Sequence, residues 1–244
     1  MDSTGLRVIS RGAERARTGP WRGDGQIAYL APAGDAVPLS ASFVRQCATE
    51  LAHQGYSRVV TSALAAAETE GFLEAGFAVE QRLHLLSHDL RNLPEAPVAA
   101  GFVIRRPRAR ERQLVLDVDA EVFDSFWRLD DAGLEEAIGA TPRARFRVMV
   151  GSPEEPRPVV GYAVTGRAHR RGYLQRLAVD TAHQGMGLGR ALVVDGLRWL
   201  RRRMVDRVLV NTQVGNERAL ELYLRLGFRH EPEGLTVLAL GLVG

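Results

Sequence analysis

The chain has 244 residues, a formal net charge of +3 at pH 7 and an isoelectric point of about 9.5. Hydrophobic residues make up 45% and charged residues 25%, which is ordinary for a soluble globular protein. No apolar run approaches the ~20 residues of a membrane helix, and none near the N-terminus is typical of a signal peptide. A single cysteine, Cys47, cannot form an internal disulfide, so we expect a cytoplasmic protein with no membrane partner.

The basic residues are unusual because, histidine apart, all 32 are arginine. With abundant Ala, Gly and Val, this composition indicates a GC-rich, bacterial coding genome. One basic cluster stands out, and it is interrupted by a proline and has no interleaved aromatics: Arg105, Arg106, Arg108, Arg110 and Arg112. Charge runs are usually solvated faces, and nucleic-acid binding needs a clustered stripe, so we expect no nucleic-acid partner.

The first part of the chain predicts a helix over 40–54, a strand over 58–60 and a helical stretch that ends at Gly76-Phe77. His84 and His88 fall in a predicted strand, where residues four positions apart are separated by about 13 Å. We therefore expect no metal site there. The prolines of Asn92-Leu93-Pro94-Glu95-Ala96-Pro97 predict a linker over 94–101.

Beyond the linker, strand signals come first and an alternation of strands and helices follows. Helices are predicted over 117–129, 132–138, 188–203 and 216–226, and strands over 102–104, 146–150, 159–165, 173–179, 208–210 and 235–240. Gly227 can adopt the left-handed conformation that ends the last helix. The pattern predicts an α/β protein.

A glycine-rich turn opens the predicted helix 188–203, with the sequence Gln184-Gly185-Met186-Gly187-Leu188-Gly189-Arg190. Amides at a helix N-terminus are unpaired and partly positive, and glycine lets a phosphate approach them. Gln184 can hydrogen-bond beside the turn, and Arg190 adds a cation. The turn therefore predicts a pyrophosphate site. It lacks the Gly-Lys-Ser/Thr ending of a phosphate-binding loop and the acidic partner of a Rossmann unit.

The predicted helix 216–226 carries one phenol, Tyr223, on the same face as Ala219, Leu222 and Leu226. A phenol in such a position can protonate a leaving group, and it can also be a simple core aromatic. His169 and Asp180 lie near the relevant strands without an assigned role, and His183 is expected at the surface. An aromatic group, Phe123, Phe126 and Trp127, is expected either to pack in the core or to line an apolar acceptor pocket. We expect Cys47 to be a small buried hydrophobic residue.

The two runs together resemble the GNAT superfamily of acyl-coenzyme A-dependent N-acetyltransferases. That family combines a Gln/Arg-x-x-Gly-x-Gly/Ala turn with an Asn-x-x-Ala-x-x-Leu-Tyr-x-x-x-Gly-Phe helix. Gln184, Gly187 and Gly189 match the turn, and a second set matches the helix: Asn216, Ala219, Leu222, Tyr223, Gly227 and Phe228. The resemblance covers residues 102–240 and implies a mixed, mostly antiparallel sheet flanked by helices.

The resemblance also implies how the site works. Acetyl-coenzyme A would be the co-substrate, no metal would be needed, and an amine would attack the thioester directly. The pantetheine arm would lie along the strand Leu177-Ala178-Val179, where a backbone N–H would stabilise the oxyanion. The pyrophosphate would bind at Gln184–Arg190, Asn216 would contact the carrier near its thiol, and Tyr223 would protonate the departing thiolate.

No general base is evident. Asn211-Thr212-Gln213 stands where some members of the family carry a glutamate, so the amine would arrive neutral or lose its proton through water. The alternative is a non-catalytic, regulatory module that binds acyl-coenzyme A. The acceptor stays open among amino sugars, small amines, protein N-termini and lysines.

The first part of the chain echoes the second. Superposing Gly76-Phe77 on Gly227-Phe228 puts Phe72 at the position of Tyr223 and Ala65 near that of Asn216, and it pairs helix 40–54 with 188–203. Asp35 lies where the glycine turn would be. We therefore predict a degenerate, non-catalytic copy of the fold over 1–93, a linker over 94–101 and a catalytic domain over 102–244. The chain would have one site and form a homodimer or an intramolecular pseudo-dimer.

Overall fold

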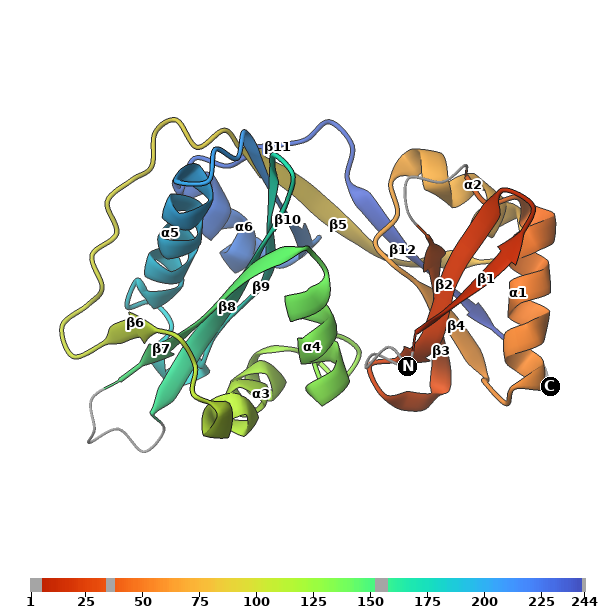
Figure 1. Cartoon of the computed structure of the whole chain (residues 1–244), viewed down its shortest axis with the longest axis horizontal. Helices are drawn as coiled ribbons and strands as arrows, with labels where there is room; N and C mark the ends of the chain where they lie inside the picture. The colour runs from red at the N-terminus through yellow and green to blue at the C-terminus, as the bar shows by residue number, and fades with distance from the viewer. Residues whose placement is uncertain (1–5, 34–37, 152–157, 243–244) are drawn as a thin grey trace. The chain divides into compact units, whose positions relative to one another are not determined.

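Figure 1 shows a computed structural model of the chain, which describes residues 6–33, 38–151 and 158–242. Asp35 lies outside these residues. The chain forms two compact units. The first unit contains residues 1–85, 211–216 and 231–244, and the second contains 86–210 and 217–230. Each unit is described separately below.

The sheet of the first unit takes its strands from both ends of the sequence. β1 (Arg7–Arg11), β2 (Glu14–Trp21) and β3 (Asp24–Pro32) are antiparallel neighbours, and β3 runs parallel to β4 (Arg58–Thr61). β12 (Leu235–Gly241) pairs antiparallel with β4 and with β5 (Ala78–His88). The last strand of the sequence thus lies between β4 and β5, and the compact units cut across the sequence ranges 1–93 and 102–244.

Two helices cover the sheet of the first unit, α1 (Ala41–His53) and α2 (Ala66–Glu74). Apolar side chains at helical spacing on α1, including Phe43 and Leu51, pack with Phe72 of α2 and with residues of β3, β4 and β12. Cys47 belongs to this core, as its sequence context predicts, and burial raises the pKa of its thiol to about 11. An inert, protonated thiol follows from that position.

The second unit has strand order β10–β9–β8–β7–β6, and it confirms a mixed, mostly antiparallel sheet. The strands are β6 (Val103–Arg105), β7 (Arg143–Val150), β8 (Val159–Ala168), β9 (Arg171–Val179) and β10 (Arg207–Gln213). α3 (Arg112–Val122) and α4 (Asp131–Gly139) pack on one face, and α5 (Leu188–Arg201) and α6 (Glu217–Arg225) on the other. The 3-10 turns Ala109–Glu111 and Thr181–His183 and the short β11 (Arg229–His230) complete it.

Two parts of this fold depart from the sequence-based expectation. The first three strands were not predicted, because charged residues interrupt their alternation. Helix α3 covers 112–122 rather than 117–129, since the Leu129 amide donates to the Asp119 side chain instead of continuing a helix. The local apolar spacing of 123–129 is helical, but the backbone there is used for tertiary hydrogen bonds.

Ion pairs neutralise part of the arginine cluster. Arg105 pairs with Glu111 at 2.6 Å, and Arg112 contacts Asp131 and Glu135 of α4. Within the described residues, no group of three or more His, Cys, Asp or Glu side chains could hold a metal ion. No described helix has the length and apolar character to cross a membrane.

His88 fixes the end of α6 in the second unit. Its buried ring accepts the Leu90 N–H at Nδ1 (2.8 Å), so Nε2 carries the proton and donates to the Leu226 carbonyl at 3.1 Å. The ring also packs edge-on against Phe228, with centroids 5.1 Å apart. Burial lowers the pKa of His88, which the charge of Asp89 only partly opposes.

The buried neutral His88 predicts acid sensitivity. Because its folded-state pKa lies below the unfolded value, the stability it contributes is present above pH ~6.5 and is lost as the pH falls, with a slope of up to ~1.4 kcal/mol per pH unit. His88→Asn should be less stable near neutral pH by about 1–3 kcal/mol, since it loses this pair of bonds. Its thermal midpoint should also change less between neutral pH and about pH 5. The exposed turn residue His169 supplies the control, His169→Asn, and an unaltered pH slope in His88→Asn would contradict the assignment.

Candidate functional site

Strand β9 loses its parallel neighbour partway along its length. The β9–β10 ladder joins Arg171 to Arg207, Val208 to Gly172 and Leu209 to Tyr173, and among the described residues it ends there. Toward its C-terminal end, β9 keeps only the antiparallel ladder with β8, in which Leu177, Ala178 and Val179 pair with Ala163, Tyr162 and Gly161. The predicted thioester strand therefore has one edge without a β10 partner.

A bulge precedes that segment. Val164 of β8 pairs with Arg176 and Thr165 pairs with Leu174, so Gln175 is an extra residue on β9. The buried amide nitrogen and oxygen of Gln175 have no hydrogen-bond partner among the described residues. The bulge changes which face each side chain meets, since Leu174 packs with α5 and α6, whereas Arg176 reaches Asp119 of α3.

The glycine turn takes the conformation that its sequence predicts. Gly185 and Gly187 have φ of +86° and +79°, and Gly187 caps α5. A Cβ on either would meet nothing within 4 Å, so the space above them is open. Ala191 N–H makes the first bond into the helix, to Gly187. The amides of Leu188, Gly189 and Arg190 therefore precede Ala191, the first backbone donor of the helix.

Gly189 lacks the left-handed conformation of Gly185 and Gly187, and a side chain at this position would make ordinary contacts. A Cβ there would lie 3.6 Å from Leu222 of α6 and 3.8 Å from Val179. The turn is also held by Gln184, which donates to the Val179 carbonyl at 2.8 Å and accepts from Arg218 of α6. The turn, the end of β9 and the first turns of α6 thus form one connected group. Met186 is half exposed, and Arg190 donates to the Glu95 carbonyl at 2.8 Å.

Tyr223 is buried on α6, one residue after Leu222, with 6% of its surface exposed. Its ring packs against Phe228, with centroids 5.5 Å apart. Burial raises the pKa of its phenol to about 12, and the positive charge of Arg176 opposes that rise. The phenol is therefore fully protonated at neutral pH and lies within the electrostatic range of Arg176.

Among the residues near the relevant strands, Asp180 is engaged with His183. Asp180 is buried and accepts from the His183 amide at 3.0 Å, and the His183 ring contacts its carboxylate at 2.6 Å. His183 is half-buried and also packs edge-on against Phe102, so it is less exposed than expected. His169 lies in the exposed β8–β9 turn.

In the first unit Gln213 donates to Gln81 at 2.9 Å. Asn216 directly precedes α6.

Several residues with structural roles beside this group were missed from sequence. Arg176, Asp119 and Tyr162 form a buried polar cluster, and Glu121 accepts both the amide and the hydroxyl of Thr181 at the end of β9. One signal was available, because Arg176 interrupts an apolar strand between Leu174 and Leu177. A charge in such a pattern requires a buried partner.

Helices α2 and α6 end in the same way. Phe77 N–H donates to Phe72 O and Phe228 N–H to Tyr223 O, each at 3.1 Å. Gly76 and Gly227, with φ of +97° and +90°, provide the left-handed residue in each. The two helices begin at Ala66 and Glu217 and have nine residues each. The phenylalanine at position 72 therefore stands where α6 carries its phenol.

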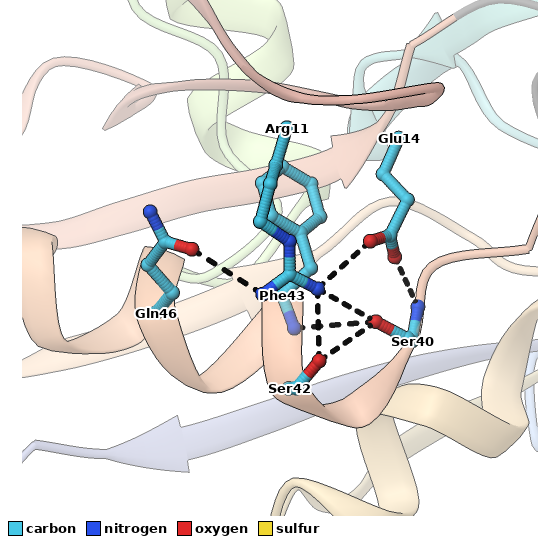
Figure 2. A network of polar contacts seen from close by, with 6 residues as sticks. All are labelled: Arg11, Glu14, Ser40, Ser42, Phe43 and Gln46. Atoms are coloured by element: carbon cyan, nitrogen blue, oxygen red, sulfur yellow. Dashed lines mark hydrogen bonds and ion pairs between the residues drawn. The ribbon is translucent and has the colours of Figure 1, made fainter.

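The N-terminal ends of α1 and α5 differ. Figure 2 shows that α1 begins against a carboxylate, since Glu14 accepts the Ser40 N–H at 2.6 Å. Arg11 holds that carboxylate at 2.8 Å and also donates to the hydroxyls of Ser40 and Ser42. Burial raises the pKa of Glu14, but the Ser40 amide and Arg11 outweigh it, so the net shift is downward. The start of α1 thus already holds an internal anion.

Comparison with known proteins places this arrangement in a family. A profile described as "Acetyltransferase (GNAT) family" matches residues 115–228. The mycothiol acetyltransferase of Acidothermus cellulolyticus is 45% identical over 115 residues, covering 47% of this chain and 34% of that protein. N-alpha-acetyltransferase 30 of Saccharomyces cerevisiae is 36% identical over 128 residues, covering 46% of this chain and 73% of that protein.

Solved structures extend the likeness of the fold to nearly the whole chain. A tandem GNAT protein from the clavulanic acid biosynthesis pathway superposes with a TM-score of 0.69 at 13% identity, covering 97% of this chain and 83% of that one. The chain spans between 34% and 58% of the length of the four mycothiol acetyltransferases that it matches. The profile match and the yeast relative show that this chain belongs to the GNAT family of acetyltransferases.

Proposed function

We propose that the chain transfers an acetyl group from acetyl-coenzyme A to a primary amine by direct attack, at one site in its second unit. The observation that carries the proposal is the connection of the glycine turn to α6 through Gln184 and Arg218, because it joins the predicted phosphate site to the helix of the buried phenol. The family supplies the acetyl-transfer chemistry, and the carrier, the acceptor and the residue roles belong to the proposal.

The turn is suited to a pyrophosphate. The amides of Leu188, Gly189 and Arg190 lie at the positive end of α5, and the left-handed glycines leave open space before them. The pantetheine arm would run along Leu177-Ala178-Val179, on the edge that β10 does not cover. The Val179 carbonyl is already used by Gln184, so the arm would bond to other backbone groups of this segment. Asn216 would contact the carrier near its thiol.

Tyr223 is the proposed acid. A phenol with a pKa of about 12 holds its proton through the physiological range, so every molecule starts in the protonated form. The departing thiolate, with a thiol pKa near ~8.5, takes the proton as the carbon–sulfur bond breaks, and the phenolate left behind is the stronger base and regains a proton from water. The amine forms the new carbon–nitrogen bond and loses its own proton to water. No described side chain is needed as a base in this scheme.

The alternative is a regulatory module that binds acyl-coenzyme A without transfer. The lack of an acidic residue at Asn211-Thr212-Gln213 motivates it. A binding module does not require an acid, and the buried phenol is present in the unit with the open turn and replaced by Phe72 in the other. We therefore favour catalysis. The names of the relatives suggest two acceptor classes to compare, the unacetylated precursor of mycothiol and peptides with a free α-amino group.

The first prediction concerns Tyr223→Phe. With acetyl-coenzyme A and a panel of amino sugars, small amines, peptides and the mycothiol precursor, wild-type protein should release free thiol, and the variant should have kcat lowered by about 10²-fold or more. Coenzyme affinity should be nearly unchanged. Because the pKa of the phenol is about 12, wild-type turnover should not fall through phenol ionisation up to about pH 10.

Tyr56→Phe, a matched substitution in the first unit, is the control for Tyr223→Phe and should keep full turnover. Equal turnover of Tyr223→Phe and wild type on the true acceptor would contradict the acid role. Coenzyme binding with no thiol release from any amine would favour the regulatory module instead.

Gly187→Ala should weaken coenzyme binding. The substitution introduces about 1–2 kcal/mol of left-handed strain and points a methyl group at the open space before the amides. We expect the Kd of coenzyme A to rise about tenfold or more in titration calorimetry. Gly55→Ala has the same kind of strain, with φ of +92° and nothing within 4 Å, and should leave the Kd unchanged. If Gly187→Ala and Gly55→Ala raised the Kd of coenzyme A equally, backbone strain alone would explain the weaker binding.

The chain should bind one coenzyme A. The start of α5 is open, whereas Glu14 already lies at the start of α1. Calorimetry or native mass spectrometry should give a stoichiometry of one per chain, and Gly187→Ala should weaken that single event. Two equivalent sites would show that the first unit also binds the carrier.

A further inference from the structure

The segment between α3 and α4, residues 123–130, is attached to β9 by a buried ion pair. Asp119 of α3 is fully buried, and Arg176 of β9 has 9% of its side chain exposed. Nε and Nη2 of Arg176 donate to the two carboxylate oxygens at 2.7 and 2.8 Å. Two parallel bonds from a planar guanidinium fix its orientation as well as its position.

Both partners of the pair also hold the backbone of the segment. The Leu129 N–H donates to Asp119 Oδ1 at 2.7 Å, and Nη2 of Arg176 donates to the Trp127 carbonyl at 2.7 Å. The guanidinium lies over the Phe123 ring, 3.5 Å from its centroid. The hydroxyl of Tyr162 donates to Asp119 as well. One buried charge pair therefore fixes the beginning, middle and end of the segment.

The bulge at Gln175 decides which face of the sheet the segment meets. Arg176 is on the same face as Ala178, which packs with α3 and α4. Leu177 and Val179 pack on the opposite face with α5, where the glycine turn begins. The segment thus lies beside the proposed thioester strand, on the side away from α5.

We propose that the Asp119–Arg176 pair positions the acceptor amine by holding residues 123–130 against β9. The inference rests on the proposed function: a carrier bound from the α5 side leaves the α3 side of β9 for the attacking amine. The half-buried rings of Phe126 and Trp127, packed edge to face with centroids 5.1 Å apart, provide an apolar surface there. The pair would therefore favour amines with an apolar group next to the nitrogen. Asp119 and Arg176 are positioning residues, since neither contacts the reacting atoms.

The double variant Asp119→Leu/Arg176→Met tests the proposal. Replacing a buried ion pair by apolar residues of similar size is often tolerated, so the fold should persist, although less stably because the Tyr162 hydroxyl loses its acceptor, while the bonds to Trp127 and Leu129 are lost. Hydrogen exchange of the Leu129 amide should accelerate, and KM for the acceptor should rise about tenfold or more. The Kd of coenzyme A should stay within about twofold of the wild-type value, because the glycine turn is unaltered.

A second ion pair of the same geometry provides the control. Arg145 of β7 donates to both oxygens of Asp195 of α5, each at 2.8 Å, on the opposite face of the sheet. Asp195→Leu/Arg145→Met should leave both Leu129 exchange and acceptor KM unchanged. If the first double variant fails to fold, Arg176→Lys supplies the same two measurements, since lysine keeps the charge and loses the bidentate geometry.

Two results would overturn the proposal. Unchanged exchange at Leu129 would show that the pair does not hold the segment, and faster exchange with unchanged acceptor KM would show that the segment does not position the amine. Absence of acetyl transfer in the wild-type protein would instead refute the proposed function, and the acceptor role of the pair with it. The exchange measurement on the protein alone would then still report whether the pair holds the segment, so the two failures can be told apart.

Discussion

The second unit depends on the point where β9 stops pairing with β10. A parallel ladder that continued to Val179 would use the backbone groups of that edge, and no carrier could bond to them. The ladder ends at Tyr173 and Leu209, and the bulge follows within two residues. The open edge and the orientation of Arg176 both follow from this short stretch of β9.

Local motifs were predictable from the sequence because their residues have one dominant physical reason each. Gly185, Gly187 and Gly227 adopt left-handed conformations, and the apolar face of α6 puts Tyr223 in the core, as the spacing predicts. Contacts between distant segments were not predictable. Nothing local to Asp119 indicates Arg176, 57 positions away, and nothing in 235–240 indicates that this strand would pair with β4. The roles of the predicted site residues, the linker over 94–101 and the oligomeric state stay predictions.

Comparison of the ends of α2 and α6 distinguishes the residues that terminate a helix from the group proposed for chemistry. Both use a left-handed glycine followed by a phenylalanine that packs on an aromatic residue five positions earlier. Phe72 satisfies this packing as well as Tyr223 does. The hydroxyl of Tyr223 therefore adds nothing that the packing requires, and burial raises its pKa. A buried titratable group with a shifted pKa is typical of a functional site.

The position of β12 has a consequence for how the protein is made. Residues 235–241 lie between β4 and β5, so the sheet of the first unit is incomplete until residue 241 has left the ribosome. Domains usually fold in order as they are synthesised, but here β4 and β5 must wait for residues 235–241. During synthesis β4 and β5 each expose an unpaired edge, and such edges favour aggregation. The arrangement therefore links the assembly of the first unit to completion of the second.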